Sequence, residues 1–259
     1  AWSTVKSNNF KALKSAERES FPTDFKLMEL NLGVIKNQLK NVPVRSNSTK
    51  SNIVITLPNV DGGIEQFEMY EASNFDADLQ AQYPEIRSYV GVGINDKSAI
   101  LRMSLDPSGI QTMVFRADKP TEFMEPYSED KTVYAIYSSS RQKGKLPFTC
   151  FTPEQELVLD LSDKTNSVSK SSTVTLLNFR LALSFNGEYA NYFGATSSAQ
   201  SALVLAAFNA TMTRVNGVFE KDFAIHMNIV AQTTNVIFYN PVTDPYTTMA
   251  SWNTQLQQT

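Results

Sequence analysis

Few residues in this sequence could carry out chemistry, because it holds one cysteine, Cys150, and one histidine, His226. A thiol and an imidazole can form a nucleophilic pair, but no local sequence typical of cysteine proteases surrounds Cys150. A catalytic zinc needs about three protein ligands, often several imidazoles, and one open position. The 259 residues cannot supply such a set of ligands.

Each of the two residues also has a structural interpretation. Cys150 lies close to Phe148 and Phe151 and could be a small buried hydrophobic residue, although its thiolate would be a strong zinc ligand. His226 shares one face of a predicted strand with Ala224 and other residues. A single histidine in that position is typical of a hydrogen-bonded core or edge residue.

These residues must be positioned by secondary structure, and the clearest pattern lies in the last third of the chain. The apolar run Val174–Phe185 predicts a buried strand. A helix is expected to begin near Ser197 and Ser198 and to end at Gly217. Period-two alternation over 223–230 predicts a second strand. Strand, helix and strand in this order favour parallel pairing in an α/β layer.

The preceding residues predict an antiparallel meander with short helices, and therefore an α+β fold whose sheet can leave one face in water. Residues 1–24 are polar and are expected to form a loose arm that lies on the surface or packs only in parts. Asp106-Pro107-Ser108-Gly109 has the composition of a β-turn. The predicted strands are Met28–Leu32, Ile53–Pro58, Ile64–Tyr70, Tyr89–Ile94, Ala99–Leu105, Ile110–Arg116 and Lys131–Ser138, and the predicted helices are Gly33–Leu39 and Asn74–Tyr83.

Composition excludes several classes of function. Hydrophobic residues make up 42% and aromatic residues 11% of the chain, which is enough for a packed core. The net charge is −3 and no long basic cluster occurs, so nucleic-acid binding is not expected. No apolar run approaches the roughly 20 residues of a membrane span. A single cysteine rules out an intrachain disulfide.

Small polar residues dominate 162–172, which has the composition of a linker. Such segments are favoured sites of proteolytic cleavage. We therefore expect three divisions: a domain over 1–161, a linker over 162–172 and a second domain over 173–259.

Three stretches carry a family resemblance: NFRLALSFNGEYANYFGAT, SALVLAAFNATMTRVNGVFEKDFAIHMNIVAQTTNVIFYNP and TDPYTTMASWNTQLQ. They resemble the start of the catalytic domain of secreted, reprolysin-like zinc metallopeptidases of flavobacteria and related bacteria, which belong to the metzincin clan. The preceding two thirds resembles the pro-region of the same proteins. The resemblance implies a β-rich pro-domain with short helices, followed by a partial metzincin-like α/β half-domain.

The zinc signature of that clan, His-Glu-x-x-His-x-x-Gly-x-x-His, does not occur before Thr259. The resemblance therefore implies a fragment without catalytic residues, from a parent protein whose zinc ligands lie outside this chain. It also implies a secreted or cell-surface zymogen that acts on proteins or peptides. Its pro-domain would confer latency and aid folding, and a missing remainder of the chain would be a natural partner.

Two site residues follow from the resemblance. Cys150 is a candidate for an inhibitory cysteine switch, a pro-region thiolate that occupies the open position of the zinc, although Phe151 stands where the known switch has glycine. Glu188 is a candidate calcium ligand, with a plain turn as the other interpretation. An alternative from another class is a non-catalytic extracellular binding or assembly module.

Overall fold

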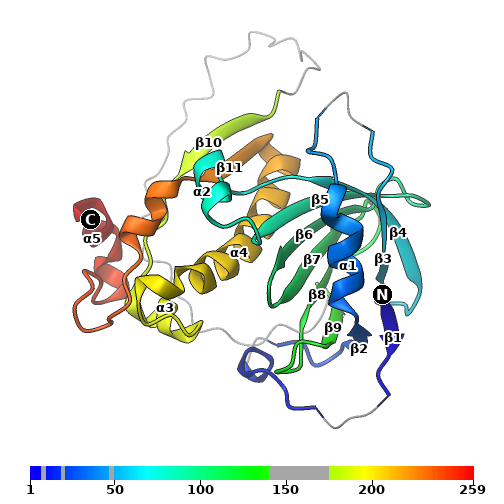
Figure 1. The fold of residues 1–259 in the computed structure, drawn as a ribbon, viewed down its shortest axis with the longest axis horizontal. Helices are drawn as coiled ribbons and strands as arrows, with labels where there is room; N and C mark the ends of the chain where they lie inside the picture. Colours follow the sequence, from blue (N-terminus) through cyan, green and yellow to red (C-terminus); the bar gives the residue numbers. More distant parts are fainter. Residues whose placement is uncertain (7–9, 19–20, 47–49, 140–174) are drawn as a thin grey trace, which may run out of the picture.

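The computed structural model describes residues 1–6, 10–18, 21–46, 50–139 and 175–259 (Figure 1). We call the described residues up to 139 the N-terminal part and those from 175 onward the C-terminal part. The predicted linker over 162–172 and Cys150 lie outside the described residues. The division into domains therefore stays a prediction.

The N-terminal part is built around a nine-stranded sheet in which every neighbouring pair is antiparallel. Seven strands, β3 to β9, follow one another as a meander, and β2 and β1 are added beside β9. The strands are β1 (Trp2–Thr4), β2 (Lys26–Leu30), β3 (Val54–Pro58), β4 (Ile64–Glu71), β5 (Arg87–Gly93), β6 (Ile100–Asp106), β7 (Gly109–Phe115), β8 (Glu122–Pro126) and β9 (Val133–Ser138).

The predicted meander is confirmed, and the turns that join its strands explain why. Asp106 pairs with Gly109 across the predicted turn, so β6 and β7 form a tight hairpin. Gly62, with φ of 91°, lies in the turn between β3 and β4, a backbone conformation that favours glycine. The sequence did not predict β8, a strand of five residues.

The arm predicted over 1–24 packs against the fold at its beginning, in the short strand β1. Trp2 lies in β1, and its indole Nε1 donates a hydrogen bond to the carbonyl oxygen of Thr56 at 2.7 Å. Its ring meets Tyr134 edge-on, with ring centroids 5.7 Å apart. An anchoring aromatic ring therefore orders a segment whose other residues are mainly polar.

One face of the sheet packs against α1 (Leu32–Gln38) and the short 3-10 helix η2 (Leu39–Asn41). Asn31 caps α1 by accepting a hydrogen bond from the backbone N–H of Val34. The core on this face consists of Ile35 of α1, Leu39 of η2 and apolar side chains of the strands, among them Ile55, Phe67, Met69, Leu101, Met103, Ile110, Met124 and Tyr134.

The C-terminal part contains a two-stranded parallel sheet and a long helix between its strands. The strands are β10 (Leu177–Leu181) and β11 (Ile225–Ile229), with Leu177 opposite Ile225. The helices are α3 (Gly187–Tyr192), α4 (Ser201–Phe223) and α5 (Trp252–Gln258). The predicted order of strand, helix and parallel strand is therefore confirmed, and the whole fold is consistent with the α+β class. The prediction that the first strand is buried is wrong for β10, whose side chains are mostly exposed: Leu177 is 52% and Phe179 50% exposed.

Helix α4 is longer than predicted, because it continues through Gly217 to Phe223 and is capped by Ala224, whose φ is 55°. Gly217 does not stop the helix; it allows the helix to approach the sheet. A Cβ at this position would lie 2.9 Å from Cγ of Arg102 and 3.0 Å from the ring of Phe115. The prediction failed because a helix glycine has two uses, a terminus or a close contact, and only the fold distinguishes them.

The face of the large sheet that could have been left in water is covered by α4 over β5, β6 and β7. Figure 1 shows α4, coloured gold, running beside the green strands. The helix is long and apolar enough to cross a membrane by length and composition. Its buried residues in this fold include Asn209, Thr213 and Asn216, which is typical of a core helix with polar contacts.

Replacement of Gly217 by alanine is expected to lower the free energy of unfolding by about 1–3 kcal/mol, because the added methyl group would overpack the contact with Arg102 and Phe115. Urea unfolding followed by circular dichroism would measure the change. Gly33→Ala in α1 is the matched control, since its Cβ would only touch Asn31 Oδ1 at 3.4 Å. Equal effects of the two variants would contradict the role given to Gly217.

Candidate functional site

The polar groups that converge in this fold lie at the boundary between the two parts, around β11. One edge of β11 pairs with β10, and the other receives a short segment of the N-terminal part, in which Phe75 forms a parallel bridge with Ile229. The N–H of Asp76 donates to the carbonyl oxygen of Ile229 at 2.9 Å, and the N–H of Ile229 donates to that of Asn74 at 2.7 Å. Residues 74–76 therefore act as a third strand of the small sheet.

The side chain of Asn74, 2% exposed, connects this segment to α4. Its Nδ2 donates to Oδ1 of Asn209 at 2.9 Å and to Oγ1 of Thr213 at 2.8 Å. Its Oδ1 accepts from Nδ2 of Asn216 at 2.9 Å. Asn216 in turn bonds the backbone N–H and carbonyl oxygen of Met227. One buried amide thus joins the third strand, α4 and β11.

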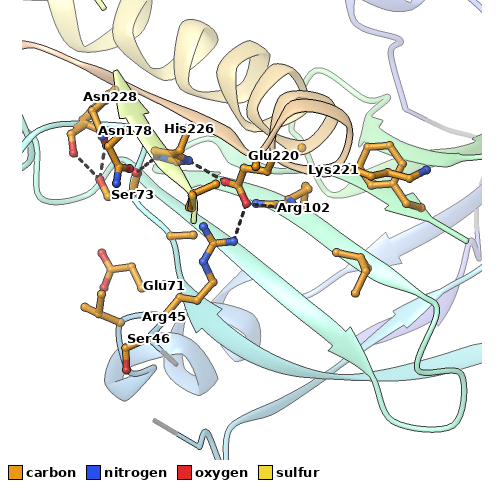
Figure 2. Close-up of a pocket in the computed structure, with 18 of the residues that line it drawn as sticks. Arg45, Ser46, Glu71, Ser73, Arg102, Asn178, Glu220, Lys221, His226 and Asn228 are labelled. Carbon is orange, nitrogen blue, oxygen red and sulfur yellow. Dashed lines mark hydrogen bonds and ion pairs between the residues drawn. The ribbon is translucent and has the colours of Figure 1, made fainter. Parts of the chain in front are cut away.

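A second buried contact gathers around Glu220, near the end of α4 (Figure 2). Arg45 and Arg102, both from the N-terminal part, donate to its Oε2 at 2.7 and 2.6 Å. Nδ1 of His226 lies 2.7 Å from its Oε1, and Nε2 of the same ring lies 3.0 Å from the carbonyl oxygen of Ser73. The Glu220 side chain is 7% exposed, so these ionic contacts are largely shielded from water.

This environment favours the ionised carboxylate. Burial by itself would raise the pKa of Glu220, but hydrogen bonds from His226, Arg45 and Arg102 outweigh burial and hold the pKa well below its ordinary value. The carboxylate is therefore an anion at neutral pH and has no proton to donate as a general acid. Its role in this arrangement is to neutralise the buried guanidinium of Arg102 and the half-buried guanidinium of Arg45, both from the N-terminal part.

A cavity of about 1140 Å³ opens beside this cluster and is lined by both parts of the chain. Figure 2 shows Arg45, Arg102 and His226 directed at Glu220, with Lys221 on the far side of the same helix. Among the described residues that line the cavity, Arg45, Arg102 and His226 all bond to Glu220. The arrangement of these charged groups is typical of a structural contact that holds the N-terminal and C-terminal parts together.

His226 is the one histidine in the sequence, so its surroundings show whether an imidazole is available to bind zinc. Both ring nitrogens of His226 already face oxygen atoms, one of Glu220 and one of Ser73. Among the residues that the structure describes, no group of three histidine, cysteine, aspartate or glutamate side chains is placed to hold a metal ion. The described residues therefore do not fit a catalytic zinc, and we derive no catalytic step through one.

The two site candidates from the sequence lie away from this boundary or outside the described residues. Glu188 is an exposed residue in the first turn of α3, after the capping residue Asn186. The nearby carboxylate of Asp244 accepts the N–H of Gly187 at 2.7 Å and that of Tyr246 at 2.9 Å. Calcium binding at Glu188 stays a prediction, as does the cysteine switch at Cys150, which falls in the undescribed segment.

A comparison with models of protein families gives a match to part of the chain. Residues 175–258, about a third of the chain, match a family model described as reprolysin-like metallopeptidases of family M12B. A search of curated proteins found no match to the chain. The matched residues run from just before β10 to the end of α5, so the similarity covers the C-terminal part and supports a reprolysin-like metallopeptidase.

The sequence did not single out the residues that meet at the boundary. Asn209, Thr213, Asn216 and Glu220 follow one another at intervals of four, three and four, which places them on one side of a helix. That spacing was available in the sequence, but it is equally typical of a solvent-exposed helix face. Arg45, Asn74 and Arg102 carry no local signal, because their partners are far away in the sequence.

Asn74→Ala is expected to lower the free energy of unfolding by about 2–4 kcal/mol, because it leaves buried partners on α4 without hydrogen bonds. Thermal and urea unfolding would measure the loss. Asn31→Ala, which removes an exposed helix cap, is the control and is expected to cost about 1 kcal/mol. If Asn74→Ala costs no more than the control, the buried network does not hold the boundary together.

The ionised side chain of Glu220 is expected to make the free energy of unfolding decrease in acid. Because its pKa is lower in the folded state than its ordinary value of 4.5, its contribution is fully present above that value and is lost as the pH falls below it. Urea unfolding at pH 7, 4 and 3 should therefore show a steeper loss of stability for the natural protein than for Glu220→Gln. Parallel pH profiles of the two proteins would contradict this assignment.

Proposed function

We propose that this chain is the pro-region and the first part of the catalytic domain of a secreted zinc metalloendopeptidase. The observation that carries the proposal is the match of residues 175–258 to the reprolysin-like metallopeptidases. The parallel strands with a helix between them are consistent with the start of such a domain. The zinc would be held by ligands outside the residues printed here, and the substrates would be proteins or peptides.

In this proposal the N-terminal part has two roles, to aid folding of the catalytic domain and to keep it latent. The buried contacts of Asn74 and Glu220 support a role in folding, because each joins the N-terminal part to α4 or β11. Latency would add the thiolate of Cys150 as an inhibitory zinc ligand. Secretion and a bacterial, flavobacterial type of parent protein belong to the same proposal and rest on the sequence resemblance.

The first test is the intact mass of the native protein under denaturing conditions, with metal content determined on the same sample. The expected result is a mass well above 28.9 kDa, the mass of these residues, with about one zinc per molecule. In that protein, Cys150→Ala is expected to raise peptidase activity before any cleavage, whereas Cys150→Ala in a metal-free sample should change nothing. A mass of 28.9 kDa without zinc would contradict the proposal and favour a non-catalytic extracellular binding or assembly module.

A further inference from the structure

We propose that the N-terminal part remains bound to the C-terminal part as a non-covalent subunit after the chain is cut between residues 140 and 174. Cleavage in this segment would then not be sufficient to release the N-terminal part. The inference concerns only the contact between the two parts and goes beyond the proposed function, since it holds whether or not the parent protein is a peptidase.

The first argument is the backbone pairing of β11. Residues 74–76 occupy the edge of β11 that β10 does not, with two backbone hydrogen bonds to Ile229. Ile229 is fully buried, so its N–H and carbonyl oxygen have no access to water in this fold. If the N-terminal part left, these groups would lose their partners and an open strand edge would remain.

The second argument is apolar packing. Phe75, Leu79 and Ile86 of the N-terminal part belong to the core of the C-terminal part and not to the core under the large sheet. Leu79 lies in the short helix α2 (Ala77–Gln82), which Asp76 caps by accepting the N–H of Leu79. In the C-terminal part this core includes Phe185, Val204, Leu205, Met212, Ile229 and Ile237. Departure of the N-terminal part would remove three large side chains from that core.

The third argument is charge. Glu220 lies in the C-terminal part, while the two arginines that neutralise it lie in the N-terminal part. Separation would leave a carboxylate without its cations on one side and Arg102, 8% exposed here, without its anion on the other. Breaking a buried ion pair by removal of one partner is strongly unfavourable. The edge of β11, the apolar core of the C-terminal part and Glu220 therefore all have the N-terminal part as their partner.

The test uses the full chain with a recognition sequence for a site-specific protease placed within 162–172. After complete cleavage, the two pieces are expected to elute together at micromolar concentration as one species with the mass of the uncut chain, 28.9 kDa. The amide hydrogens of Asp76 and Ile229 are expected to remain protected from exchange. Separate elution, or precipitation of either piece, would overturn the proposal.

A pair of variants distinguishes contact across the boundary from general stability. Glu220→Gln is expected to raise the dissociation constant of the cut protein about a hundredfold. Glu122→Gln is the matched control, because the Glu122 side chain is equally buried and its partners among the described residues, Arg116 and the N–H of Val60, both lie in the N-terminal part. It should lower stability and leave the dissociation constant unchanged. Equal effects on dissociation would overturn the proposal, and neither measurement requires zinc or peptidase activity.

Discussion

The compensation of one buried carboxylate by cations from a distant part of the chain is the constraint on which this structure depends. The burial of Glu220 near the end of α4 is compensated by His226 of β11 and by Arg45 and Arg102, which reach it from the loop before β3 and from β6. Gly217, three residues earlier on the same helix, allows the close approach that this contact needs. The position of α4 on the sheet is therefore fixed by charge and by the lack of a side chain, as well as by apolar packing.

The small parallel sheet also depends on contact between the two parts of the chain. Its central strand, β11, has neighbours on both edges only when the N-terminal part supplies residues 74–76. Parallel strands are usually covered and paired on both sides, because their connections place helices over the faces of the sheet. Here a segment between two strands of an antiparallel meander completes a parallel sheet, so the two architectures share residues and cannot be described as separate layers.

Most of the local structure could be predicted from the sequence, because it follows from patterns within a few residues of each other. The hairpin of β3 and β4, the turn at Asp106–Gly109 and the alternation in β11 are of this kind. The predictions failed where a distant contact decides the outcome. Trp2 orders its strand through Thr56, and Gly217 continues its helix against Arg102. His226 was correctly given a structural interpretation, but its partners Glu220 and Ser73 could not be identified from spacing.

The separation in sequence of the paired segments also determines the order in which this protein can fold. The strands β3 to β9 are neighbours in both sequence and space, so the meander can form while the later residues are still being synthesised. The bond between His226 and the carbonyl oxygen of Ser73 joins residues 153 positions apart. The third strand and the buried polar groups near it must therefore wait, with Phe75 and Leu79 unpacked, until β11 has been made. During synthesis the nascent chain therefore passes through a stage in which the large sheet can be complete while the apolar side chains of Phe75 and Leu79 are still exposed, and exposed apolar surface of this kind favours aggregation.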